Sequence, residues 1–202
     1  MNKREEQKEE RRNKILEVSL NLFVEKGFAG TKISDISAAA NMSAGLFFHY
    51  FESKEQVYKE LVEMGLGGTQ NSMQIQFDDP INFFECVTDW IFSSINLNRN
   101  VAKMFVLMAN AQIDKGTPEH IREIALKVNN ISESVKLIEK GQKSGSIRQG
   151  NPIELSIAFW CAIQGIATFA AINPDVRMIS DTRLITREHL FPVSIRTRKV
   201  RI

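Results

Sequence analysis

Residues 43–54 read SAGLFFHYFESK, and their side chains can contact another molecule. Aromatic rings run without a break from Phe47 to Phe51. A core helix buries one stripe and leaves its other faces polar, so rings that point all round the axis must partly face outward. His49 and Tyr50 also carry hydrogen-bond donors. We therefore expect the outer face of this segment to bind another molecule instead of packing in the protein core.

Two short helical segments joined by Asn41 and Met42 form a helix-turn-helix candidate. In this motif the second helix lies in the DNA major groove, and its first residues reach the base edges. Ala44 and Gly45 are small enough to approach the bases closely, and Leu46 can contact a thymine methyl group. We therefore expect the start of the second helix to read base sequence.

Contacts to the phosphate backbone are expected on both sides of that helix. His49 and Tyr50 can donate to phosphates, and Phe48 would lie beside the sugar-phosphate wall. Lys54 lies in the first turn of the following helix, where free backbone N–H groups already favour an anion. The complete set of expected DNA-binding residues is Thr31, Lys32, Ser43, Ala44, Gly45, Leu46, Phe48, His49, Tyr50 and Lys54.

A second interpretation remains open for the same residues. Short Ala-rich helices followed by aromatic residues occur in many helical cores, and a helix-turn-helix shape alone is weak support. The alternative is a helical module whose head binds protein instead of DNA. Such a module would show no salt-dependent binding to duplex DNA.

Apolar residues recur at helical spacing along the whole chain and no strand pattern is present, so we expect an all-α fold. A first helix should end at Gly27, and Thr31, Ser43 and Ser53 can cap the next three. Capping residues followed by Pro open three of the later helices. Those later helices are expected over roughly 80–97, 100–114, 118–143 and 152–172, with a weaker one over about 181–190.

Composition excludes several kinds of chemistry. The net charge is only +2, so any nucleic-acid site must depend on where individual cations lie. No Ser/His/Asp order, carboxylate pair or phosphate-binding glycine loop is present, and we expect neither catalysis nor a cofactor. Cys86 and Cys161 are too few for a zinc site and lie in apolar patterns, so we expect both to be buried and reduced.

The chain shows no sign of a membrane partner. It has no run of 18 or more apolar residues, and its charged first residues lack an apolar signal region. We therefore expect a cytoplasmic protein. The basic tail 191–202 is open to two interpretations: a flexible tail that contacts DNA, or an arm on a partner.

The stretch from Ile15 to Leu61 resembles the DNA-binding domain of the TetR family of transcriptional regulators. The run LNLFVEKGFAGTKISDISAAANMSAGLFFHYFESKEQVYKEL carries the resemblance. The matching elements are Leu22-Phe23, Gly27-Phe28, Thr31, Ile36, Ala40, Ser43, Gly45, Tyr50-Phe51 and Ser53-Lys54-Glu55. One departure is Phe48, where the family usually has a Tyr whose hydroxyl meets a phosphate.

The resemblance implies a ligand-responsive regulator, mainly a repressor, that binds a palindromic DNA operator as a homodimer. Residues 1–52 would form the helix-turn-helix head, a helix over 53–75 would connect, and residues 76–202 would form the helical ligand-binding and dimerisation domain. An unknown small-molecule effector, largely apolar, would release the operator. Bulky and flexible side chains with one amide are the expected pocket residues: Trp90, Phe105, Met108, Trp160 and Gln164.

The helix expected over 152–172 supports a dimer independently. It carries one charge, Glu154, and is apolar nearly all round, so more than one side must be covered. One side can face its own domain and another a partner. The alternative is a central core helix of a monomer. The expected interface residues are Phe159, Ile163, Gly165, Ile166, Ala167 and Ala170.

Overall fold

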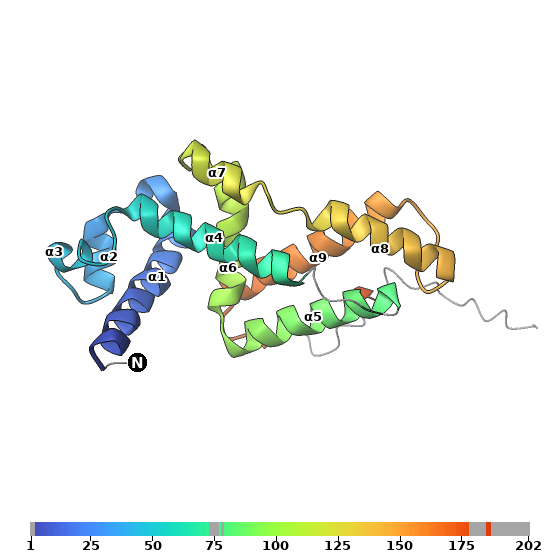
Figure 1. The fold of residues 1–202 in the computed structure, drawn as a ribbon, viewed down its shortest axis with the longest axis horizontal. Coiled ribbons are helices and arrows are strands. Elements are labelled where there is room, and N and C mark those ends of the chain that lie inside the picture. Colours follow the sequence, from blue (N-terminus) through green and yellow to red (C-terminus); the bar gives the residue numbers. More distant parts are fainter. Residues whose placement is uncertain (1–2, 73–76, 78, 178–184, 187–202) are drawn as a thin grey trace, which may run out of the picture.

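The structure is a computed structural model, and it describes residues 3–72, 77, 79–177, 185 and 186. All regular structure in these residues is helical, as expected (Figure 1). The helices are α1 (Lys3–Gly30), α2 (Ile33–Ala39), α3 (Ala44–Phe47), α4 (Lys54–Ser72), α5 (Pro80–Leu97), α6 (Asn100–Ile113), α7 (Glu119–Ala125), α8 (Asn130–Ser144) and α9 (Pro152–Ile172).

Local capping chemistry sets the short helices of the head. Gly27 leaves the helical conformation with φ of 70°, which a residue with a side chain rarely adopts, and so ends the regular part of α1 where the sequence predicts. The backbone N–H of Leu46 donates to Ser43 Oγ at 3.2 Å, which confirms the cap of α3. The N–H of Gln56 donates to Ser53 Oγ at 3.1 Å at the start of α4.

The sequence predicts three helix starts that combine a capping residue with Pro, and two of them are confirmed. Asp79 accepts from the N–H of Ile81 ahead of α5, and Asn151 accepts from the N–H of Ile153 ahead of α9. The expected single helix over 118–143 is wrong, because the structure divides it into α7 and α8. The expected helix over 181–190 and the tail 191–202 lie outside the described residues, apart from 185 and 186.

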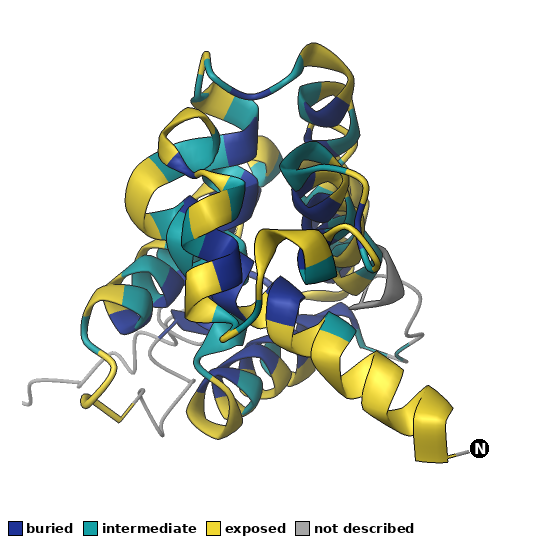
Figure 2. Cartoon of the chain, turned by 90° about the vertical axis from the view of Figure 1, so that its left-hand side faces the viewer, coloured by how far each residue is buried: buried dark blue, intermediate teal, exposed yellow. Residues whose placement is uncertain are grey.

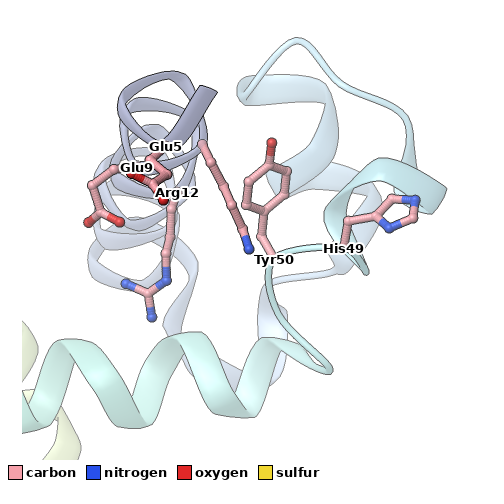
Figure 3. Close-up of a pocket in the computed structure, with 6 residues that line it drawn as sticks. Glu5, Glu9, Arg12, His49 and Tyr50 are labelled. Atoms are coloured by element: carbon pink, nitrogen blue, oxygen red, sulfur yellow. The ribbon is translucent and has the colours of Figure 1, made fainter. Parts of the chain in front are cut away.

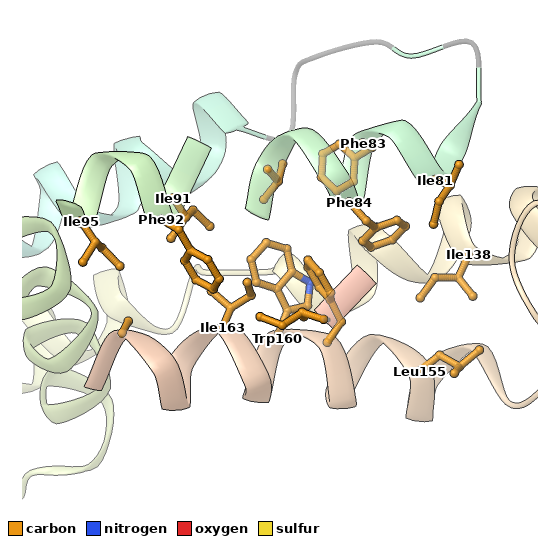
Figure 4. Close-up of a cluster of buried hydrophobic side chains, with 14 of the residues drawn as sticks. Ile81, Phe83, Phe84, Ile91, Phe92, Ile95, Ile138, Leu155, Trp160 and Ile163 are labelled. Carbon is orange, nitrogen blue, oxygen red and sulfur yellow. The ribbon is translucent and has the colours of Figure 1, made fainter. Parts of the chain in front are cut away.

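The buried side chains form two clusters. The first joins α1, α2, α3 and α4 to the last turns of α6 and to α7, so the core of the head continues into the C-terminal region. The second fills the space between α5, α8 and α9 and the start of α6, where Phe84, Phe92 and Trp160 lie between the helices (Figure 4). Figure 2 shows that the first turns of α1 extend beyond the first cluster and are exposed.

Helix α9 is long and apolar enough to cross a membrane by length and composition alone. In the structure it packs most extensively on α8 and α6, and Phe159, Ile163 and Ala167 on it are fully buried in the second cluster. The expectation of buried cysteines is wrong. Cys86 on α5 and Cys161 on α9 are free and exposed, because each lies on the outward side of its helix.

Candidate nucleic-acid interface and effector cavity

The structure divides the aromatic segment into an inner and an outer set. Phe47 and Phe51 are buried in the core of the head, four residues apart as helical spacing requires. Phe48 and His49 are exposed, and Tyr50 is half-buried. The side chain of Phe48 is 54% exposed, an unusual position for a large apolar ring. This exposed ring lies directly after α3, where the major-groove wall is expected.

The first turn of α3 is open to solvent. Ser43, Ala44 and Gly45 are exposed, and Leu46 is half-buried. A Cβ added to Gly45 would meet only Ser43 Oγ, at 3.9 Å, so no other described residue covers Gly45 on this side. Lys32, just before α2, is also exposed. Of the ten expected DNA-binding residues, four therefore lie at the start of α3, and Lys32 lies at the start of α2.

Thr31 does not belong to this surface, and its expected role as a helix cap and phosphate donor is wrong. Its side chain is fully buried, and its hydroxyl donates to the carbonyl oxygen of Gly27 at 2.8 Å. Lys32 occupies the N-cap of α2 instead. The hydroxyl therefore fastens the end of α1 to the start of α2.

Lys54 points partly inward. Its ammonium donates to the carbonyl oxygens of Phe28 at 2.7 Å and Thr31 at 2.8 Å, and it lies 4.4 Å from the centre of the Phe28 ring. Partial burial lowers the pKa of this ammonium. An ammonium has three N–H donors, so one is left for a phosphate. Lys54 thus ties α4 to the end of α1, a role that sequence reasoning missed.

A second tie joins α1 to α4 at Arg12. Its guanidinium binds the Glu60 carboxylate through two hydrogen bonds, which raise the pKa of Arg12, and it lies 4.8 Å from the centre of the Phe51 ring. Through Lys54 and Arg12, a displacement of α4 would carry the head with it.

Two adjoining cavities lie at the other end of α4. The inner cavity, about 440 Å³, lies between α1, α4, α5 and α6, and the outer cavity, about 650 Å³, lies between α4, α6, α8 and α9. Both are lined by Gly65, Thr69, Met104, Phe105, Asn130 and Trp160. Glu17 is the only charged side chain that lines either one among the described residues.

The expected pocket residues come together at these cavities. Trp90 lines the inner one, Met108 and Gln164 line the outer one, and Phe105 and Trp160 line both. Trp160 is fixed by its indole N–H, which donates to Ser134 Oγ at 3.0 Å. Trp90 is 55% exposed and so stands at the edge of its cavity. Sequence reasoning missed Met104, Asn130 and Thr69 of the shared lining.

Helix α9 presents a different outer face from the one expected. Phe159, Ile163, Ala167 and Ala170 are fully buried within their own chain, so placing them at a dimer interface is wrong. Ile166 is half-buried, and Gly165 is exposed with nothing within 4 Å of an added Cβ. The exposed side of α9 is an apolar stripe made of Ile157, Ala158, Cys161, Gly165, Phe169 and Ile172, which are spaced three or four residues apart from Ala158 onward.

The structure has an exposed short helix on a three-helix head, and one long helix joins this head to a larger helical region with apolar cavities. This arrangement defines a helix-turn-helix transcription regulator. Residues 15–61 match the family described as bacterial regulatory proteins, tetR family. This match identifies residues 15–61 as a TetR-family DNA-binding domain.

Similar proteins extend the match over most of the chain. The HTH-type transcriptional repressor KstR2 of Rhodococcus jostii is 23% identical over 173 residues, which cover 82% of this chain and 84% of that protein. The crystal structure of the MbdR regulator from Azoarcus sp. superposes with a TM-score of 0.67 at 20% identity, covering 88% of this chain and 94% of MbdR. A SmeT–triclosan complex gives a TM-score of 0.64 at 17% identity, covering 91% of this chain and 93% of SmeT. These structures share the fold of this chain.

Proposed function

We propose that the chain is a homodimeric transcriptional repressor that binds a near-palindromic operator and is released by a small-molecule effector. The observation that carries this proposal is the division of the aromatic segment. Phe47 and Phe51 anchor α3 in the core of the head, while the start of α3 and Phe48 remain open to a groove. The proposal includes a head over 1–52, a connecting helix over 53–75 and an effector and dimerisation region over 76–202.

The contacts proposed for DNA are revised from the sequence set. The exposed residues at the start of α3 would meet base edges, and Phe48, His49 and Tyr50 would lie along the backbone. Lys32 and the third N–H of Lys54 would bind phosphates. Thr31 is removed from the set because its hydroxyl is buried.

The lining of the two cavities supports an effector that is neutral and largely apolar. Apolar side chains, aromatic and Met residues among them, supply most of the wall, and amides such as Asn130 and Gln164 supply a few hydrogen bonds. No Lys or Arg of the described residues lines either cavity, so an anionic ligand would lose its hydration without a partner. SmeT, which shares this fold, has been crystallised with triclosan.

The apolar stripe of α9 supports the homodimer. Small side chains at Ala158, Cys161 and Gly165 in its middle would allow two copies of α9 to approach closely across a two-fold axis. Exposed Ile157, Phe169 and Ile172 at its two ends would be covered in the same contact. Such a dimer contact would account for the apolar surface of α9 without a membrane. The proposal places the protein in the cytoplasm as a DNA-binding regulator and not as an enzyme.

The experiment that tests the proposal is selection of bound sequences from random duplexes, followed by footprinting. Two heads related by symmetry require inverted half-sites about one helical turn apart, roughly 10 bp, or a multiple of it. Recovery of such an inverted repeat supports the proposal. No enrichment of any sequence, together with no salt-dependent binding, would favour the protein-binding module instead.

A further inference from the structure

The first turns of α1 carry charge that is sorted by face. Residues four apart are helix neighbours, and Arg4 with Lys8 and Glu6 with Glu10 repeat the same sign at this spacing. Residues three apart are neighbours as well, and there Glu5 with Lys8 and Glu9 with Arg12 pair opposite signs. Lys8 and Arg11, also three apart, place two cations together on one face.

The basic face points toward the recognition helix. Lys8 and Arg11 lie seven and four residues before Ile15, so the three share one side of α1. Ile15 is fully buried in the core of the head, against the cluster that holds α2 and α3. Glu6 and Glu10 lie on the opposite side. Lys8 and Arg11 are exposed, and no ion pair described within the head involves either of them.

A cleft of about 480 Å³ separates this face from the turn after α3. Glu5, Lys8, Glu9 and Arg12 line it from α1, and His49 and Tyr50 line it from the other wall. Figure 3 shows Tyr50 standing beside α1, whereas Glu9 and Arg12 extend from the side of α1 turned away from Tyr50. The cleft thus has the cation of Lys8 on its α1 wall and the donors of Tyr50 and His49 on the opposite wall, and the carboxylates of Glu5 and Glu9 line it as well.

We propose that the basic face of α1, made of Lys8 and Arg11, is a second DNA-binding element that holds the phosphodiester backbone beside the recognition helix. The proposal rests on the DNA-binding function above. Lys8 acts with Tyr50 and His49 on a phosphate at the cleft, and Arg11 extends the contact along the strand. The first turns of α1, which reach beyond the core, would then bind DNA outside the base pairs that α3 contacts.

Salt titration of operator binding tests this element. Each lost phosphate contact lowers the slope of log affinity against log salt by about 0.9, so Lys8→Gln with Arg11→Gln should lower it by about two units per head and weaken binding roughly tenfold or more. The control is Lys14→Gln with Lys59→Gln, which removes the same charge from exposed sites elsewhere on α1 and α4. This control should keep the wild-type slope.

A second variant holds the net charge constant. Lys8→Glu with Glu10→Lys moves one cation from the basic face to the opposite face and should weaken binding as charge removal does. Wild-type affinity in this variant, or an unchanged slope for the Lys8 and Arg11 double variant, would overturn the proposal while leaving DNA binding intact. If the wild-type protein itself bound duplexes without salt dependence, the proposed function would fail instead.

Discussion

Gly65 of α4 lies against Met108 of α6 so closely that a Cβ on Gly65 would stand 2.5 Å from Met108 Sδ. Gly65 also lines both cavities. The helix that carries the head therefore forms part of the proposed effector site. A ligand that separates α4 from α6 here would act on the head through Lys54 and Arg12.

Filling this contact should block the ligand and weaken operator binding, because a side chain at Gly65 would push α4 away from Met108 of α6. Gly65→Leu would place a side chain at the junction of the two cavities, and we expect affinity for Nile red, a neutral apolar dye, to fall at least tenfold. Operator affinity should fall in the same variant, because the head follows α4 through Lys54 and Arg12. Dye fluorescence and operator titration measure the two effects.

Gly67→Leu is the matched control, because nothing lies within 4 Å of a Cβ at that position on the same helix. It should retain wild-type dye binding. Equal dye affinities for the Gly65 and Gly67 variants would place the ligand elsewhere.

Phe48 offers a gain-of-function test. Phe48→Tyr adds a hydroxyl to an exposed ring at the proposed backbone contact, and a hydrogen bond to a charged group contributes about 1.5 kcal/mol or more. Binding to duplexes of every sequence should tighten by roughly tenfold per head. Phe48→Ala should weaken it. A Tyr variant that binds no more tightly would show that the ring does not face a phosphate.

Lys54 should matter for both stability and binding. Lys54→Gln loses two hydrogen bonds from a charged donor to the carbonyls of Phe28 and Thr31, so the free energy of unfolding should fall by about 1–2 kcal/mol. Urea denaturation measures this, with Lys59→Gln, a partner of Glu63 on the surface, as a control expected to cost less than about 0.5 kcal/mol.

The same Lys54 variant distinguishes the two roles of the ammonium. If its third N–H binds a phosphate, the salt slope of operator binding should fall by about one unit per head. A destabilised variant whose affinity and slope match the wild type would leave Lys54 with the internal role alone.

Two arginine substitutions on α9 test which side faces a partner. Gly165→Arg on the apolar stripe should give a folded monomer, because the charge meets only the dimer contact. Ala167→Arg should unfold the chain, because an unpaired buried charge costs several kcal/mol. Light scattering and circular dichroism measure the outcomes. A folded, intact dimer for Gly165→Arg would move the interface off the stripe.

The two exposed cysteines give an independent check. Mild oxidation should link protomers through Cys161, which lies within the stripe, in a Cys86→Ser background. It should not link them through Cys86 in a Cys161→Ser background. Cross-linking through Cys86 alone would assign the interface to α5.

The sequence predicted the helical class and the caps of α3 and α4, because these depend on local spacing and side-chain type. The predicted interface residues of α9 were wrong because apolar residues surround the whole helix axis, so their periodicity does not show which side faces the core. Phe159 and Gly165 were therefore assigned to the same face. The prediction for Thr31 was wrong for another reason. A hydroxyl that precedes a helix can cap that helix or hydrogen-bond to the carbonyl oxygen of an earlier residue, and the packing of α1 on α2 decides between the two.

The measurement that tests the central claim most directly is the affinity of one effector for the free protein and for the operator complex. A screen of neutral apolar compounds by thermal shift would supply the effector, and Trp90 and Trp160 at the cavities would report its binding by fluorescence. If it weakens operator binding about a hundredfold, the coupling is roughly 3 kcal/mol, and the operator must weaken effector binding by the same factor. The account predicts that equal, reciprocal loss. Identical effector affinities in the two states would contradict release of the operator by that ligand.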